Sequence, residues 1–265
     1  MGKTSTFNRI HIVGVSARSG TTLMAECMRI CFDIDAFEPH ESPLWKMRRD
    51  ASIYLTKRPN DIMYLGARLA LDPRLTIICM MRDPRDVIVS KHQIRPDQYF
   101  TSLGRWKYRL RFVEKYTHHP RFIIVKYEDF IRDPDGTQAF LLSKIPFLKK
   151  KRDFSEFHQS SDISKGSAKA LGGLRPIDAR NIANWKNHLP RLVEQINRYG
   201  GIDSDLIRYH YETDSEWAKE LSGVEPLKGH PKDKRVSKNL KHYYVTYPLG
   251  AVAAYFSYLL SLRYI

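Results

Sequence analysis

Short apolar runs and segments of helical periodicity alternate along the chain. The runs predict strands at 10–15, 33–37, 53–56, 76–81 and 121–125. Apolar residues at helical spacing predict helices at 21–31, 60–70, 84–94, 100–117, 135–144, 177–186 and 190–199. The run at 75–81 is apolar throughout, which is typical of a strand buried on both faces of a parallel sheet. The alternation predicts an α/β fold, a central parallel β-sheet with helices on both faces.

The C-terminal part has a different pattern. Residues 228–241 are rich in lysine and arginine, and residues 243–262 then carry no charged side chain. We therefore expect one domain over residues 1–220, followed by a basic linker and an apolar helical tail over 221–265. The tail fits a helix packed on the core or on a homodimer partner, an interfacial anchor at a membrane surface, or a membrane span. Its pattern leaves these three interpretations open.

Composition narrows the class of protein. The 265 residues are 42% hydrophobic, enough for one sizeable core, and the net charge of +15 suits an anionic cofactor. The basic residues are spread along the chain without a nucleic-acid-binding motif, so we expect no nucleic acid partner. The three cysteines form no four-ligand metal pattern, and residues 1–9 are polar rather than a secretory leader. We expect buried reduced thiols, no metal, and a cytoplasmic protein that is peripheral to a membrane if the tail is an anchor.

The connection between the first strand and the first helix predicts an anion site. A small-residue loop that leads from a strand into a helix N-terminus directs backbone N–H groups and the positive end of the helix dipole outward. A nucleoside triphosphate loop has four residues between its glycines and a lysine after the second glycine. Here five residues separate Gly14 from Gly20, Thr21 replaces that lysine, and Arg18 supplies the cation. The loop therefore suits an anion other than a γ-phosphate with its magnesium.

Two further strand ends carry candidate ligand-binding residues. Arg82 follows the strand at 76–81, and Ser90 comes eight residues later in the expected helix. Arg82 can hold a phosphate through two hydrogen bonds, or it can form an ion pair with Asp86. Tyr127 follows the strand at 121–125, where its ring can either contact a ligand or pack in the core.

Together these motifs resemble the sulfotransferases that use 3′-phosphoadenylyl sulfate (PAPS), over roughly residues 8–200. Residues 17–22, Ala-Arg-Ser-Gly-Thr-Thr, are similar to the family's 5′-phosphosulfate loop P-[KR]-S-G-T-T, with alanine in place of the proline. The arginine and serine at 82 and 90 match its 3′-phosphate motif, and residues 127–134 match Y-E-[DEQ]-L-x-x-x-P. Residues 173–190 are similar to a segment of tyrosylprotein sulfotransferases in which a basic residue and a proline precede a helix that ends in K-W-x-x-x-[IL]-P. In that family the basic residue, here Arg175, and a serine-rich loop before it, here 160–167, close over the cofactor. The pattern is nearest to tyrosylprotein and bacterial glycan sulfotransferases.

The resemblance implies a P-loop-type sheet and in-line transfer of a sulfuryl group from PAPS to an acceptor hydroxyl, with 3′,5′-diphosphoadenosine as product. A glycan or lipid-linked sugar is the expected acceptor, and a peptide tyrosine is the alternative. The cofactor-binding residues that it implies are Arg18, Ser19, Gly20, Thr21, Thr22, Arg82, Ser90, Tyr127 and Arg175. Two other classes stay open, a P-loop kinase or nucleotide-binding protein and a non-catalytic module that binds anionic ligands.

The general base is expected in the polar segment after the second strand. In related sulfotransferases a catalytic glutamate follows that strand, and Glu38 lies 20 residues after Arg18. A carboxylate there could take the proton from the acceptor hydroxyl. His40 is the second candidate because its ordinary pKa suits proton transfer, and Glu41 is the third. The segment could also hold no catalytic residue.

Overall fold

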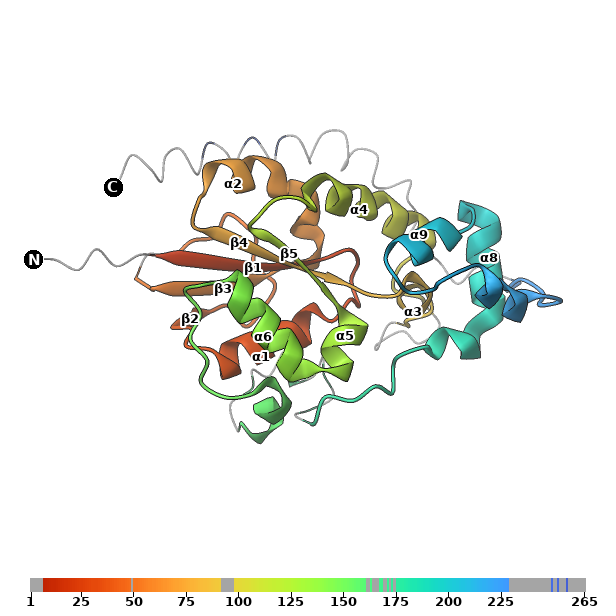
Figure 1. Cartoon of the computed structure of the whole chain (residues 1–265). Helices are drawn as coiled ribbons and strands as arrows, with labels where there is room; N and C mark the ends of the chain where they lie inside the picture. Colours follow the sequence, from red (N-terminus) through yellow and green to blue (C-terminus); the bar gives the residue numbers. More distant parts are fainter. Residues whose placement is uncertain are drawn as a thin grey trace, which may run out of the picture.

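The protein has a parallel five-stranded sheet in the order β2-β3-β1-β4-β5 (Figure 1). The strands are β1 (Asn8–Gly14), β2 (Ala36–Phe37), β3 (Ile53–Lys57), β4 (Leu75–Met81) and β5 (Phe122–Lys126). The computed structural model describes residues 7–48, 50–91, 98–160, 163, 167, 168, 171, 173, 175–228, 249, 252 and 256. All five predicted strands and their parallel arrangement are confirmed, although the second is shorter than predicted, with only Ala36–Phe37 of 33–37 in a strand.

The register places the carboxyl ends of the central strands at one edge of the sheet. Ile12 of β1 lies opposite Lys57 of β3 on one side and Ile78 of β4 on the other. Met81, the last residue of β4, lies opposite Lys126 at the end of β5. The loops that follow β1, β4 and β5 therefore leave from the same edge, where ligands bind in open α/β sheets.

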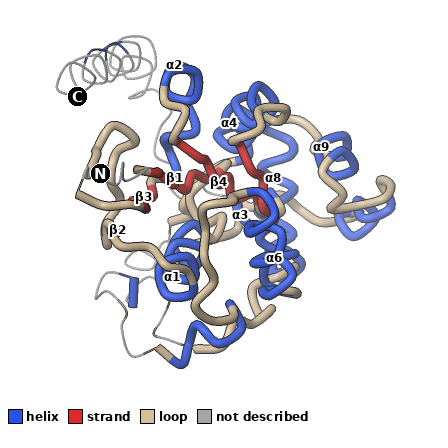
Figure 2. Tube along the Cα trace, turned by 60° about the vertical axis from the view of Figure 1, so that its left-hand side comes forward, coloured by secondary structure: helices blue, strands red, loops and turns tan. Residues whose placement is uncertain are grey.

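Helices cover both faces of the sheet, as predicted (Figures 1 and 2). One face packs on α1 (Thr21–Cys31), α6 (Pro134–Lys144) and the 3₁₀ helix η2 (Phe154–Gln159). The other packs on η1 (Pro59–Tyr64), α2 (Leu65–Leu71), α4 (Leu103–Tyr116), α8 (Leu189–Tyr199) and α9 (Asp203–Arg208). Strand β4 contributes side chains to the hydrophobic core on each face of the sheet. Ile78 and Met80 pack on the α1 side, and Ile77 and Cys79 pack on the α4 side.

The connections that follow the neighbouring strands β1 and β4 run to opposite faces. Strand β1 leads into α1 on one face, and β4 leads through α3 (Pro84–Ile88) to α4 on the other. Adjacent strands whose connections diverge leave a crevice between their loops. The phosphate-type loop after β1 and the arginine after β4 meet in this crevice.

The helix predicted at 84–94 is wrong beyond residue 88. Pro84 begins α3, and the Asp83 side chain accepts a hydrogen bond from the backbone N–H of Arg85. The helix ends at Ile88, and the Ser90 carbonyl accepts a hydrogen bond of 2.9 Å from Phe100 N–H. Ser90 thus lies after the helix rather than within it, because a long-range contact turns the chain. Residues 92–94 of the predicted helix lie outside the described residues.

The helix predicted at 177–186 is also wrong. Residues 175–183 are irregular, and only the 3₁₀ helix η3 (Asn184–His188) forms at the end of the segment. The Asp86 carboxylate accepts hydrogen bonds of 2.9 Å from the backbone N–H groups of Ala183 and Trp185. Ala183 takes a left-handed conformation with φ of 59° to allow this. A buried acid from another segment replaces the helical acceptors of these amides.

The structure tests some of the remaining predictions. The three cysteines are free and buried, as expected. In the part of the chain that the structure describes, no helix has the length and apolar character needed to cross a membrane. Most of the predicted tail, including 229–248, lies outside the described residues. The boundary near residue 220, the membrane contact through 243–262 and the homodimer therefore stay predictions.

Candidate functional site

The loop between β1 and α1 is shaped to bind an anion. Arg18 and Gly20 both have left-handed backbones, with φ of 73° and 88°. These two left-handed residues bend the backbone between the end of β1 and the start of α1. The first helical turn of α1 contains no acidic residue. The first N–H groups of a helix have no acceptor within that helix, so this end of α1 favours a negatively charged ligand. The Ser19 hydroxyl accepts a hydrogen bond of 3.3 Å from Ser16 N–H within the loop.

Tyr127 packs directly against this loop. A Cβ atom built on Gly20 would lie 2.5 Å from Cδ2 of the tyrosine ring, so no larger residue fits there without movement. The Arg82 guanidinium lies 4.5 Å from the centre of the same ring. Tyr127 is buried, yet it also lines the cavity, so it both packs in the structure and faces the ligand space.

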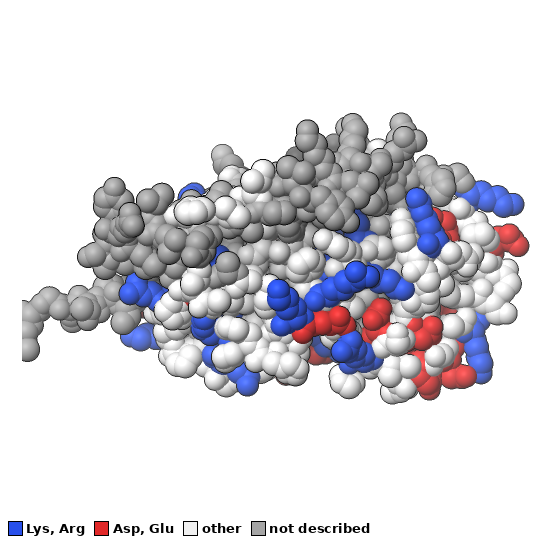
Figure 3. All heavy atoms as spheres, turned by 90° about the horizontal axis from the view of Figure 1, so that it is seen from above, with Lys and Arg blue, Asp and Glu red and all other residues white. Residues whose placement is uncertain are grey.

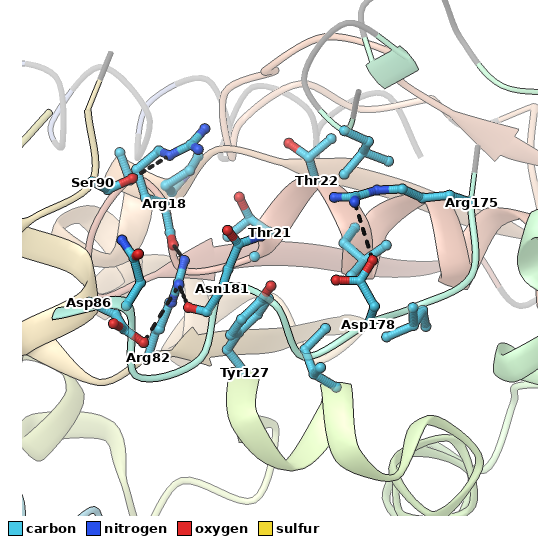
Figure 4. A pocket seen from close by; sticks show the side chains of 18 of the residues that line it. Arg18, Thr21, Thr22, Arg82, Asp86, Ser90, Tyr127, Arg175, Asp178 and Asn181 are labelled. Atoms are coloured by element: carbon cyan, nitrogen blue, oxygen red, sulfur yellow. Dashed lines mark hydrogen bonds and ion pairs between the residues drawn. The ribbon is translucent and has the colours of Figure 1, made fainter. Parts of the chain in front are cut away.

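Two arginines from different loops meet beside Tyr127 (Figure 4). Arg82 donates hydrogen bonds to the backbone carbonyls of Arg18, at 3.1 Å, and Asn181, at 2.5 Å. Arg18 donates through Nε to the Ser90 hydroxyl at 3.0 Å. Burial and then the positive charge of Arg82 lower the pKa of Arg18. A bound anion would relieve this repulsion.

Arg82 also lies near Asp86, the partner that the sequence offered as an alternative to a phosphate. Its Nη2 atom is 3.7 Å from Asp86 Oδ2. Burial raises the pKa of Asp86, although Arg82 opposes that effect. The ion pair and a ligand-binding role do not exclude each other, because both side chains line the same cavity.

The cavity has a volume of about 420 Å³ and brings together most of the predicted cofactor-binding residues. Figure 4 shows Arg18 and Ser90 on one side, Arg175 with Asp178 on the other, and Thr21 and Tyr127 between them. The predicted residues on its wall are Arg18, Gly20, Thr21, Thr22, Arg82, Ser90, Tyr127 and Arg175. Ser19 of the same loop is buried and is not on the wall.

The structure separates the three candidate bases. Glu38 is not on the cavity wall, because its carboxylate accepts a hydrogen bond of 2.9 Å from Tyr54 and lies 2.8 Å from Lys46 Nζ. Burial favours the neutral form of Glu38, but the contacts with Lys46 and Tyr54 outweigh it and lower the pKa. His40 is exposed and also off the wall, whereas Glu41 lies on it. Of the three candidates, Glu41 is thus the one on the cavity wall, and the identity of the base stays a prediction.

Some residues near the site escaped the sequence analysis. Lys57 ends β3 and is buried, and burial lowers its pKa despite the nearby charges of Glu26 and Glu41. The sequence feature that could have identified Lys57 is a lysine at the end of a mostly apolar strand. The apolar part of the cavity wall was not predicted either, and it contains Leu23, Phe100, Ile131, Phe157 and Ile177. Among the residues that the structure describes, no cluster of acidic, histidine or cysteine side chains suits a metal ion.

Comparison with known proteins agrees with the motifs. The model of the sulfotransferase family matches residues 40–145. The match includes β3, β4 and β5, with Arg82 and Tyr127 in it, while the phosphate-type loop lies before it. The resemblance to the sulfotransferases is thereby confirmed. No curated protein matches the chain in sequence.

Solved structures with some likeness to this chain include two domains titled as sulfotransferases and a retinol dehydratase. The sulfotransferase domain of the Synechococcus PCC 7002 olefin synthase is 15% identical, with a TM-score of 0.44 over 70% of this chain and 90% of that one. The sulfotransferase domain of the curacin biosynthetic pathway is 14% identical, with a TM-score of 0.44 over 83% and 99%. Retinol dehydratase in complex with androsterone and the inactive cofactor PAP is 13% identical, with a TM-score of 0.40 over 86% and 84%. Likeness at this level carries no conclusion about activity.

The contact between Gly20 and Tyr127 predicts the effect of adding one methyl group. Gly20→Ala should destabilise the protein by more than the roughly 1 kcal/mol expected for alanine at a positive φ, because its Cβ also collides with the tyrosine ring. Gly223→Ala is the matched control, since Gly223 has φ of 73° and nothing lies within 4 Å of its added Cβ. Urea unfolding of both variants measures the difference. Equal losses of stability in the two variants would show that the Tyr127 ring moves aside at no cost in free energy.

A buried carboxyl beside Tyr127 predicts a pH effect on stability. Glu128 accepts a hydrogen bond of 3.0 Å from Asp83 N–H, and burial raises its pKa from 4.5 to about 7. Between these two values the unfolded chain loses its proton while the folded chain keeps it. This group therefore lowers the free energy of unfolding as pH rises from 4.5 to 7, by about 3 kcal/mol at most.

Glu128→Gln should remove that pH dependence while keeping the acceptor for Asp83 N–H. Urea unfolding at pH 5 and pH 8 gives the stability of the variant relative to the wild type. We expect the glutamine variant to gain stability relative to the wild type at the higher pH. A constant difference between the two proteins would contradict the raised pKa.

Proposed function

We propose that this chain transfers a sulfuryl group from PAPS to an acceptor hydroxyl. The observation that best supports this proposal is the meeting of Arg18 and Arg82 in one cavity beside the N-terminus of α1. PAPS has two separate anionic groups, a 5′-phosphosulfate and a 3′-phosphate, so it can satisfy two arginines at once. The family match over residues 40–145 supports the same activity.

The residues on the cavity wall fit such a cofactor. The amides at the start of α1 and Arg18 suit the 5′-phosphosulfate, whereas Arg82 and Ser90 suit the 3′-phosphate. The apolar wall next to Tyr127 suits the adenine ring. Arg175, which forms an ion pair of 3.2 Å with Asp178, is the proposed closing residue.

In the proposed mechanism PAPS supplies an activated sulfuryl group on a phosphate leaving group. Arg18 stabilises the negative charge that develops on the leaving oxygen, because its guanidinium is already fixed by Ser90 and the loop. Glu41 accepts the proton of the attacking hydroxyl, which its place on the wall favours over Glu38. The charge of Glu41 opposes the lowering of the pKa of Lys57 by burial, so the two side chains lie near each other.

The acceptor and the cellular setting are also proposals. A glycan or lipid-linked sugar hydroxyl stays the preferred acceptor, ahead of a peptide tyrosine. The net charge of +15 suits an acceptor that is itself anionic. On the face seen in Figure 3, lysine and arginine side chains lie beside aspartate and glutamate side chains. A cytoplasmic location, with contact at a membrane surface if the tail is an anchor, is proposed from the sequence pattern only.

Nucleotide titrations test the proposed cofactor. The 3′-phosphate contact of Arg82 should make 3′,5′-diphosphoadenosine bind roughly tenfold to a hundredfold more tightly than adenosine 5′-phosphate. Arg82→Lys should narrow this gap, because lysine cannot make the two parallel hydrogen bonds of a guanidinium. Arg208→Lys, an exposed substitution on α9, should keep it.

The same titrations separate the other two classes of function. Equal affinity for the two adenosine nucleotides would remove the 3′-phosphate site. Tighter binding of ATP with magnesium would favour a kinase or nucleotide-binding protein instead. Binding of a polyanion such as heparin without binding of either nucleotide would favour a non-catalytic module.

Substitution of the two glutamates tests the proposed base. Glu41→Gln should reduce turnover by about 10²–10⁴, since it keeps the size of the side chain and removes the proton acceptor. The affinity for 3′,5′-diphosphoadenosine should stay within about twofold, because the arginines and the loop are unchanged. Glu38→Gln should lose much less turnover, and His40→Gln almost none. A large loss in Glu38→Gln together with a normal Glu41→Gln would assign the base to Glu38.

A further inference from the structure

The segment that carries the candidate bases has no regular structure of its own. Its described residues between β2 and β3 form turns, bends and extended chain. We name residues 38–48 the base loop, because both Glu38 and Glu41 belong to it. A loop without helix or strand needs other contacts to hold one position. In this protein, two buried charged side chains supply such contacts to the main chain of the base loop.

The first of these residues is Asp61, on η1. Its side chain is fully buried, and Oδ2 accepts a hydrogen bond of 2.7 Å from the backbone N–H of Leu44. His11 of β1 lies 3.3 Å from the same oxygen, and Arg58 lies 3.6 Å from the other. Hydrogen bonds to an ionised acceptor are stronger than neutral ones. Asp61 thus holds the base loop by a main-chain amide.

The second is Arg9, on β1, whose side chain is almost fully buried. Its Nη1 atom lies 2.7 Å from Asp72 Oδ2, which balances its charge. Its Nη2 atom donates to the backbone carbonyls of Lys46, at 3.1 Å, and Leu44. The amide and the carbonyl of Leu44 are therefore held by buried groups of opposite charge.

Main-chain hydrogen bonds also flank Glu41 on both sides. On the N-terminal side of Glu41, Glu38 N–H donates to the Leu55 carbonyl at 3.2 Å, and on the other side Ser42 N–H donates to the Lys57 carbonyl at 3.0 Å. Only residues 39–41 lie between these two bonds. The chain after Ser42 is then held at Leu44 and Lys46 by Asp61 and Arg9.

Burial of these charged groups calls for an explanation beyond stability. Removing charges from water is costly, and well-packed apolar side chains often stabilise a protein equally well. Apolar side chains cannot, however, accept from an N–H or donate to a carbonyl of an irregular loop. The charged groups thus do something specific, which is to bind the main chain of the base loop.

We propose that Arg9 and Asp61 are positioning residues that keep Glu41 on the cavity wall. This proposal rests on the proposed sulfuryl transfer and on Glu41 as its base. Neither residue touches the cavity, so both act through the base loop. Their effect belongs to proton transfer from the acceptor and not to cofactor binding, which uses Arg18, Arg82 and Tyr127.

The test compares Asp61→Ala, Asp61→Asn and a matched control, Asp35→Ala. Asp35 also accepts two backbone hydrogen bonds, of 2.6 and 2.7 Å from Ser52 and Ile53, but it anchors the start of β3 instead of the base loop. Asparagine at 61 keeps an oxygen acceptor for the Leu44 amide. The readouts are turnover with labelled PAPS, the affinity for 3′,5′-diphosphoadenosine, and hydrogen exchange of the Leu44 amide.

Asp61→Ala should lower turnover by about tenfold to a hundredfold, the effect of displacing a catalytic group by about 1 Å. Nucleotide affinity should stay within about twofold, and exchange of the Leu44 amide should rise at least about tenfold. Asp61→Asn should restore most of the turnover and protection. Asp35→Ala should keep normal turnover and speed exchange only at residues 52 and 53.

Equal losses of nucleotide affinity and turnover in Asp61→Ala would overturn the proposal, since they would show a general loss of structure. The proposal would also be overturned if Asp61→Asn lost as much turnover and amide protection as Asp61→Ala. If Asp61→Ala does not fold, the paired substitution of Arg9→Met with Asp72→Asn decides, because it removes both buried charges together and should give the same pattern. If the wild type transfers no sulfuryl group, the proposed function fails, while amide exchange still reports whether Asp61 holds the loop.

Discussion

The site depends on keeping two guanidinium groups close together away from bulk water. Arg18 and Arg82 come from loops after neighbouring strands, and each charge disfavours the other. The fold offsets this repulsion with neutral acceptors and with aromatic and acidic neighbours. Arg82 donates to two backbone carbonyls, lies over the ring of Tyr127 and approaches Asp86. The arginines are thus held in place before any ligand arrives, which lowers the cost of ordering them on binding.

The same contacts join distant parts of the chain. Through its carbonyl partners, Arg82 ties the loop after β1 to the irregular segment near Asn181. Asp86 fixes that segment again by its hydrogen bonds to Ala183 and Trp185. One short motif after β4 therefore organises the cofactor side of the cavity. Near Glu41, Arg9 of β1 and Asp61 of η1 bind the main chain of the base loop, so this part of the structure has its own set of buried charges.

Local pattern was enough to predict the sheet and to identify residues that the structure brings together in one cavity. Apolar runs such as 75–81 mark buried strands, and parallel strands end at one edge, so residues just after them converge. Local pattern was not enough where a hydrogen bond from a distant part of the chain determines the conformation. The helix expected at 177–186 is replaced by hydrogen bonds to Asp86. A distant group also decides where Glu38, still a predicted base, lies, because Tyr54 donates a hydrogen bond to its carboxylate. That second contact depends on the register of β2 against β3, which periodicity does not specify.

The most direct test of this account is transfer itself. The full chain is incubated with labelled PAPS and a panel of sugar, lipid-linked sugar and tyrosine-peptide acceptors, and the products are identified by mass spectrometry. The account predicts a sulfated product from at least one hydroxyl acceptor and release of 3′,5′-diphosphoadenosine in equal amount. Tight binding of the diphosphoadenosine without transfer to any acceptor would contradict it and leave a binding protein in place of an enzyme.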